Sequence, residues 1–217
     1  MPASQFGDPR GPKGWLAAQV VARLTGEANR WMIDCLQVGP DGRVLDVGCG
    51  PGLAVAMAAR ATQGLVAGVD VSSTMVRHAR RRNRTAVREG RVEIRLADAV
   101  RLPYPDGHFT RVGSLNSLQF WPLPDDGLRE LYRVLAPNGR LVLVVMARRD
   151  DPPGPDAPPW LKETVDCLRA AGFATVATDS NRFGGVLHRA LLAVRPAHSD
   201  ADLGKGMAPP STPRRTG

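Results

Sequence analysis

The stretch from Val44 to Gly52 most constrains how this 217-residue chain can fold. Val44–Val47 is a short apolar run with β-branched residues that follows a Gly-Pro-Asp-Gly turn, so it predicts a buried parallel strand. Gly48, Gly50 and Gly52 alternate directly after it. Glycine is needed where the backbone takes a positive φ or where a ligand approaches closer than a Cβ would allow. The stretch therefore predicts a strand, a ligand-binding loop and a helix whose first N–H groups lie beside that loop.

A second apolar run, Leu65–Val69, predicts the next parallel strand, and Asp70 ends it. An acidic side chain at this place can accept hydrogen bonds from both ribose hydroxyls of a bound nucleotide. A dinucleotide site would carry a third glycine or alanine where this chain has Leu53. The spacing therefore favours a ligand with an unphosphorylated ribose in a site that is not of the dinucleotide type.

Two motifs, VLDVGCGPG at 44–52 and VAGVDVSSTMVRHAR at 66–80, resemble the class I S-adenosylmethionine-dependent methyltransferases of the small bacterial methyltransferase-domain type. The resemblance covers residues 15–196 and is tightest over 43–146. It implies an α/β fold, a Rossmann-like doubly wound seven-stranded sheet in the order 3-2-1-4-5-7-6 with the last strand antiparallel. It also implies S-adenosyl-L-methionine as the cofactor. The alternative is a Rossmann-like unit that binds no cofactor.

The resemblance also implies which residues bind the cofactor. Asp46 and the glycines would hold its amino acid end, and Asp70 its ribose. Asp98 would accept from the adenine amino group beside the Ala99 amide, and a carboxylate at the carboxyl end of a strand can read such a donor on physical grounds too. The full predicted set is Asp46, Gly48, Gly50, Gly52, Asp70, Val71, Met75, Asp98, Ala99 and Ser114.

The segment after the fourth predicted strand, Phe109–Ser114, carries the candidate acceptor site. Asn116 can donate to or accept from a substrate, and Phe120 and Trp121 can exclude water or stack on it. The alternative is that both aromatic residues anchor the loop in the core. Methyl transfer by in-line displacement needs chiefly alignment and exclusion of water, so we assign no catalytic residue. We interpret His108 as a turn residue rather than as a base.

Apolar periodicity predicts the remaining elements. We expect helices over Trp15–Leu36, in the arginine-rich segment after Asp70, over Pro124–Ala136 and over Trp160–Ala171, the third stopped by Pro137-Asn138-Gly139. We expect strands over 91–96, 140–146, 173–178 and 185–194. Residues 1–14 are interpreted as a flexible N-terminal arm, 15–196 as the domain and 197–217 as a disordered tail. The arm either folds over the cofactor or is a disordered leader.

Composition limits the partners. The formal net charge is +8, and much of it comes from arginines between 77 and 88, for which a solvated helix face is one explanation and phosphate binding the other. This run has no interleaved aromatic residues for base stacking. No run approaches the roughly 20 apolar residues of a membrane helix, and residues 1–9 do not have the pattern of a secretory signal, so we expect a cytoplasmic protein. The cysteines, Cys35, Cys49 and Cys167, are too few and scattered for a disulfide framework or a zinc site, and we expect no metal.

Three functions are compatible with these observations. The first is a methyltransferase acting on a small molecule, as a monomer or homodimer, without nucleic acid or membrane as a partner. The second is a non-catalytic cofactor-binding or regulatory protein of the same fold. The third is a methyltransferase acting on RNA or protein, which only the basic charge supports. Residues 114–117 read Ser-Leu-Asn-Ser rather than the Asn/Asp-Pro-Pro-aromatic motif of nucleic-acid adenine enzymes, which favours a small-molecule acceptor.

Overall fold

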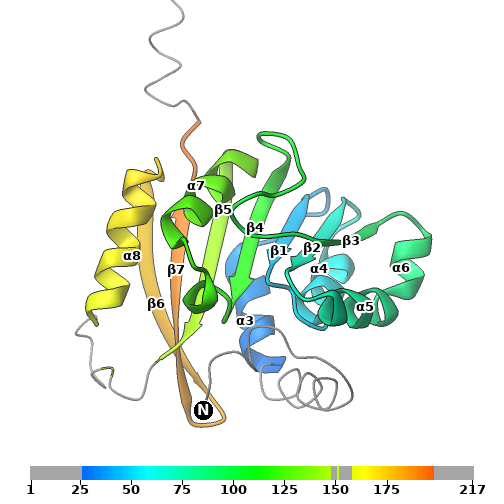
Figure 1. Ribbon diagram of the computed structural model, residues 1–217, viewed down its shortest axis with the longest axis horizontal. Helices are drawn as coiled ribbons and strands as arrows, with labels where there is room; N and C mark the ends of the chain where they lie inside the picture. The colour runs from blue at the N-terminus through cyan, green and yellow to red at the C-terminus, as the bar shows by residue number, and fades with distance from the viewer. Residues whose placement is uncertain (1–25, 148–150, 152–157, 198–217) are drawn as a thin grey trace, which may run out of the picture.

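Seven strands form one sheet in the order β3-β2-β1-β4-β5-β7-β6 (Figure 1) in the computed structural model, which describes residues 26–147, 151 and 158–197. The strands are β1 (Val44–Val47), β2 (Val66–Asp70), β3 (Val92–Leu96), β4 (Phe109–Leu115), β5 (Leu135–Met146), β6 (Thr175–Phe183) and β7 (Val186–Val194). Only β7 pairs antiparallel, with β5 and β6, while the other neighbours are parallel. The predicted order and the antiparallel last strand are confirmed. The predicted arm, the start of the helix expected from Trp15, and residues 198–217 of the predicted tail lie outside the described residues.

Helices cover both faces of the sheet, because its central strands are buried on both sides. The helices are α3 (Gly26–Leu36), α4 (Leu53–Ala61), α5 (Ser73–Arg82), α6 (Arg84–Arg88), α7 (Pro124–Val134) and α8 (Pro159–Ala170), with one 3-10 turn, η1 (Leu118–Phe120). On one face α3, α4 and α5 contribute Met32, Val55 and Val76 to a buried cluster. On the other face α7 and α8 contribute Leu131 and Leu168 to a second cluster. The result is a three-layer sandwich (Figure 1).

The arginine-rich segment, predicted as one helix, forms two short ones that meet at Asn83. Asn83 is 6% exposed, and its Nδ2 donates to the carbonyl oxygens of Gly52 at 3.1 Å and Ala79 at 2.9 Å. Asparagine is a weak helix former because its side chain competes for backbone groups. The prediction of a single helix was therefore wrong, and the break ties the end of α5 to the glycine loop.

The fifth strand begins at Leu135 rather than at the predicted Arg140. Pro137–Gly139 does not separate helix from strand, as we expected, but lies inside β5, where the pairing register with β4 shifts between Phe109 and Arg111. A β-bulge accommodates such extra residues without ending the strand. The helix before it, α7, ends at Val134 instead of Ala136.

The last two strands make a longer hairpin than predicted. Strand β6 runs to Phe183 rather than to Thr178, and it turns into β7 at Gly184 and Gly185, which have φ values of 55° and 80°. The hairpin reaches past the ends of the neighbouring strands (Figure 1), where Phe183 lies 5.7 Å from the ring of Trp31 in α3. This ring contact attaches the tip of the hairpin to α3, in the helix layer on one face of the sheet.

Candidate functional site

The glycine loop lies between the carboxyl end of β1 and the start of α4. Gly48, Gly50 and Gly52 have φ values of 73°, 51° and 77°, which disfavour any residue with a Cβ. A Cβ on Gly48 would lie 2.1 Å from Oγ of Ser117, whereas a Cβ on Gly50 would meet no described atom within 4 Å. The loop is therefore packed against protein at Gly48 and faces open space at Gly50.

The Asp70 carboxylate is fixed beside this loop. Its Oδ2 accepts from the Gly50 amide at 2.9 Å, and its Oδ1 accepts from the Ser72 amide at 2.8 Å. The residue is 9% exposed. Hydrogen bonds from two amides to an ionised carboxylate hold the side chain in one orientation at the carboxyl end of β2.

A second carboxylate, Asp46, is buried in β1 and is 5% exposed. Burial and, to a smaller extent, the charge of Asp70 together raise the pKa of Asp46 to about 7. Loss of hydration and a nearby like charge both favour the protonated carboxyl. A cation bound at this place would reverse that preference, and perturbed groups of this kind cluster at functional sites.

Ser114 at the end of β4 carries a buried hydroxyl. The residue is 1% exposed, and its Oγ has no hydrogen-bond partner among the described residues. It follows Gly113, which pairs with Asp46 of β1. An unpaired buried hydroxyl costs about 1–3 kcal/mol, so a polar ligand group fits at this position.

The other predicted cofactor residues lie at the same edge of the sheet. Val71 directly follows β2 and is 58% exposed, and Asp98 follows β3 and accepts from the Val100 amide at 3.2 Å. Met75 and Ala99 are buried at 6% and 5% exposure. The structure thus gathers the predicted set around the ends of β1 to β4, with Ala99 in a buried apolar cluster.

Asn116 fastens the loop after β4 to the end of β5. It has a positive φ of 52°, its amide donates to the Val144 carbonyl at 2.7 Å, and its Oδ1 accepts from the Met146 amide at 2.7 Å. Asparagine tolerates this backbone conformation better than most residues. The side chain therefore has a structural role in addition to the predicted contact with a substrate.

Phe120 and Trp121 differ from each other. Phe120 is 45% exposed, whereas Trp121 packs against the core, and its Nε1 donates to Ser117 Oγ at 2.9 Å. A Cβ on Gly127 would lie 2.6 Å from the Trp121 ring, so α7 needs glycine there. Trp121 is therefore anchored in the core, which was the alternative to a substrate contact, whereas Phe120 is not.

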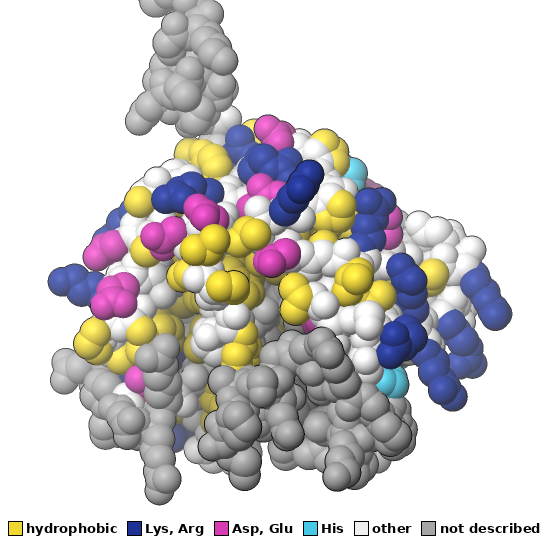
Figure 2. Space-filling view, in the orientation of Figure 1, with side chains coloured by type: hydrophobic (Ala, Val, Ile, Leu, Met, Phe, Trp, Pro, Cys, Tyr) yellow, Lys and Arg dark blue, Asp and Glu magenta, His cyan; other side chains and the backbone are white. Residues whose placement is uncertain are grey.

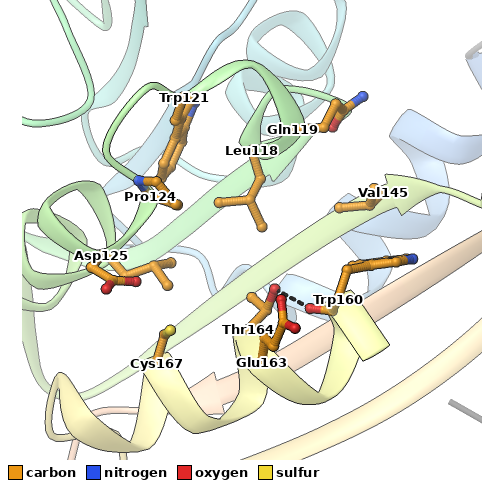
Figure 3. Close-up of a pocket in the computed structure, with 11 residues that line it drawn as sticks. Leu118, Gln119, Trp121, Pro124, Asp125, Val145, Trp160, Glu163, Thr164 and Cys167 are labelled. Atoms are coloured by element: carbon orange, nitrogen blue, oxygen red, sulfur yellow. Dashed lines mark hydrogen bonds between the residues drawn. The ribbon is translucent and has the colours of Figure 1, made fainter. Parts of the chain in front are cut away.

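A cavity of about 280 Å³ lies between the loop after β4, α7 and α8 (Figure 3). Its walls come from four parts of the chain, the loop after β4, α7, β5 and α8, and the lining residues are Leu118, Gln119, Trp121, Pro124, Asp125, Leu128, Val145, Trp160, Glu163, Thr164 and Cys167. Sequence reasoning identified only Trp121 among them. It also missed Ser117, the neighbour of Gly48, because a short polar residue in a loop carries no periodic signal.

The part of the chain that the structure describes has neither a metal-binding cluster nor a membrane-spanning helix. No group of three His, Cys, Asp or Glu side chains there is arranged to hold a metal ion. None of the described helices combines the length and apolar character needed to cross a membrane.

Comparison with known proteins adds independent findings. Residues 45–143 match the family model described as "Methyltransferase domain". The chain is 43% identical over 119 residues to Methyltransferase GfsG of Streptomyces halstedii, covering 54% of this chain and 43% of that protein. It is 38% identical over 138 residues to 27-O-demethylrifamycin SV methyltransferase of Amycolatopsis mediterranei, covering 64% and 48%. The chain thus spans less than half the length of both relatives.

The fold also matches solved structures. The crystal structure of a SAM dependent methyltransferase from Aquifex aeolicus superimposes with a TM-score of 0.65 and 22% sequence identity, covering 88% of this chain and 95% of that one. At this identity the likeness concerns the fold. The family model covers the strands from β1 to β5, which are also the strands whose ends build the site.

Proposed function

Since the chain belongs to the class I S-adenosylmethionine-dependent methyltransferases through its domain at residues 45–143, we propose that it transfers a methyl group to a small-molecule acceptor by in-line displacement. The observation that supports this proposal most directly is the arrangement of residues at the ends of β1, β2 and β4, which we call the cradle. There Gly50 faces open space near two carboxylates, Asp46 and Asp70, and the unpaired hydroxyl of Ser114.

The residues of the cradle fit S-adenosyl-L-methionine in charge and in shape. That cofactor supplies a methyl group on a sulfonium, already a strong electrophile. The Asp46 carboxylate would accept from the ammonium group, and this contact would stabilise the charge that burial disfavours. Gly50 leaves room for the close approach, and Asp70 would accept from the ribose hydroxyls. Asp98, exposed at the end of β3, would accept from the adenine amino group.

The small-molecule acceptor is supported by relatives whose names describe small-molecule chemistry, such as 27-O-demethylrifamycin SV methyltransferase. Because this chain covers less than half of those proteins, their substrates are not transferred to it. Asn116, Phe120 and Trp121 remain our candidates for the acceptor contact, since all three lie on the loop beside Gly48. The protein's role in this account is alignment and exclusion of water. We further propose a cytoplasmic monomer or homodimer.

A transfer assay tests this proposal. The purified protein is incubated with S-adenosylmethionine and a panel of hydroxylated small molecules, and S-adenosylhomocysteine and methylated product are followed by mass spectrometry. Turnover of at least one acceptor is expected, with strong loss in Asp70→Ala and none in Asp41→Ala, an exposed carboxylate in the turn before β1. Cofactor binding without turnover of any acceptor would instead favour the non-catalytic cofactor-binding protein.

A methyltransferase acting on RNA or protein is the second candidate, because arginines gather over α5 and α6 (Figure 2). Arg77, Arg81, Arg84 and Arg88 are exposed, and none of them forms an ion pair with another described residue. Electrophoretic RNA binding at rising salt separates the candidates. Affinity that falls about 10³-fold or more between 50 and 200 mM salt would be nonspecific charge attraction, and binding that persists would promote the RNA candidate.

A further inference from the structure

We propose that the cavity between α7 and α8 binds the apolar body of the methyl acceptor. The acceptor is then an apolar small molecule that is uncharged or positively charged. This inference rests on the proposed function and deepens it. Four observations carry it: the lining of the cavity, its connection to the glycine loop, the exposed apolar residues beside it, and its charge.

The lining is mainly apolar and aromatic. The indoles of Trp121 and Trp160 face it together with Leu118 and Val145 (Figure 3). A volume of 280 Å³ is many times the roughly 10–15 Å³ that a single water needs on the same measure. Interiors pack with few voids larger than one water, so this space exceeds a packing defect and suits a compact apolar group.

Much of the polar lining is already engaged within the protein. Nε1 of Trp121 donates to Ser117 Oγ, and Nε1 of Trp160 donates to Asp151 Oδ1 at 2.9 Å. The hydroxyl of Thr164 donates to the Trp160 carbonyl at 2.8 Å. A ligand therefore meets ring faces and aliphatic groups, which are complementary to an apolar molecule, together with the polar side chains of Gln119, Asp125 and Glu163.

One loop connects the cavity to the glycine loop. Ser117 lies against Gly48 on one side and accepts from Trp121 on the other. The next residue, Leu118, lines the cavity. The segment 116–121 thus contacts the glycine loop through Ser117 and lines the cavity through Leu118 and Trp121.

Exposed apolar side chains continue the cavity lining along the carboxyl edge. Phe120, Leu123, Met146 and Val186 are 45%, 55%, 46% and 40% exposed. The first two follow β4, Met146 ends β5, and Val186 begins the antiparallel β7, so all four lie at the same edge of the sheet. We call these four residues the apolar rim. Exposed apolar residues that gather in one region mark a binding surface.

Charge at the cavity excludes an anionic occupant. Asp125 and Glu163 lie in the lining, and the Asp125 carboxylate is the largest of the causes, ahead of burial, that raise the pKa of Cys167 to about 11. The arginines gather at the other end of the molecule over α5 and α6 (Figure 2). An anion in the cavity would meet two carboxylates, whereas a neutral or cationic molecule would not be repelled.

The test uses the neutral fluorescent probe N-phenyl-1-naphthylamine and the full chain. Thr164→Phe fills the cavity from α8, and Lys162→Phe adds the same ring at an exposed position of α8 that does not line it. We expect saturable probe binding with energy transfer from tryptophan. Binding should weaken about tenfold or more in Thr164→Phe and stay unchanged in Lys162→Phe, while calorimetry shows the same S-adenosylmethionine affinity in all three proteins.

Two results would overturn the inference: no saturable binding by the wild-type protein, or wild-type affinity in Thr164→Phe. If Thr164→Phe does not fold by circular dichroism, Thr164→Leu replaces it, with a smaller loss expected. An acceptor found in the transfer assay should show a raised KM in the cavity variant and an unchanged KM for the cofactor. Probe binding without cofactor binding would contradict the role of the cavity as an acceptor site. The proposed function is tested separately, by the transfer assay.

Discussion

At the scale of single residues, the buried Asp46 makes stability depend on pH, and the proposed function links the same carboxyl to cofactor binding. Its folded pKa of about 7 lies above the ordinary value of 3.8, so the folded protein holds the proton more tightly than the unfolded chain. Stability therefore falls as the pH rises from about 4 to about 7. Thermal melts of the ligand-free protein across this window should show the decline, and Asp46→Asn should flatten it. A wild-type melting temperature that declines no more than that of Asp46→Asn through the same window would contradict the account.

The same carboxyl should release a proton when the cofactor binds. An ammonium group beside Asp46 favours the ionised form, so its pKa falls in the complex. Titration calorimetry at pH 7 in two buffers of different ionisation enthalpy should then report release of up to about half a proton, and affinity should rise from pH 6 to pH 8. Equal heats in both buffers would contradict a contact between Asp46 and the ammonium group of the cofactor.

Gly48 and Gly50 form a matched pair. Both have positive φ, so alanine strains the backbone at either position by about 1–2 kcal/mol. Only at Gly48 would the new Cβ also collide with Ser117, which adds about 1–3 kcal/mol of overpacking. Chemical denaturation should show Gly48→Ala as the less stable variant, partly restored by Ser117→Gly. Equal losses at the two glycines would mean that the loop after β4 does not pack on the glycine loop.

Sequence reasoning reached some of these residues and not others. The glycines and Asp70 could be found because a strand, a turn and a helix start are local patterns. The packing of Ser117 on Gly48 could not be found, since the two residues are 69 positions apart and only the pairing of β1 with β4 brings them together. The engagement of Asn116 with Met146 depends on the same kind of long-range placement.

At the scale of elements, the break between α5 and α6 stabilises the glycine loop. Asn83 bonds the carbonyl of Gly52 from a buried position, so Asn83→Ala should lose about 1–3 kcal/mol of unfolding free energy. The matched control is Asn181→Ala on the exposed strand β6, which should change stability by less than about 0.5 kcal/mol. Equal denaturation midpoints for the two variants would contradict the role of Asn83.

Periodicity predicted most elements but few of their ends. The apolar runs located every strand, because burial on one or both faces leaves a local mark. Pro137–Gly139 has the composition of a turn, yet it forms a bulge in β5 because β4 supplies a pairing partner. Strand β6 is almost wholly exposed along its length, so no apolar pattern marked its extension to Phe183.

At the scale of the whole molecule, the sheet divides the site into two halves. The ends of β1 to β3 carry the acidic residues and glycines of the cradle, beside the exposed Val71 and Leu96, whereas the ends of β4 and β5 and the start of β7 carry the apolar rim. The strand order came from family resemblance rather than from periodicity, which does not report which strands pair. The cavity was not predictable, since Leu118 and Thr164 come from elements far apart in the chain.

The most direct test of the account is calorimetric titration of the purified protein with S-adenosylmethionine and S-adenosylhomocysteine, repeated on Asp70→Ala and Asp41→Ala. We predict saturable binding of both ligands at one site. Affinity should fall about 100-fold in Asp70→Ala, since a carboxylate that accepts from two hydroxyls is lost, and should be unchanged in Asp41→Ala. Absence of binding by folded wild-type protein, or equal affinity in Asp70→Ala, would contradict the cofactor site on which the account rests.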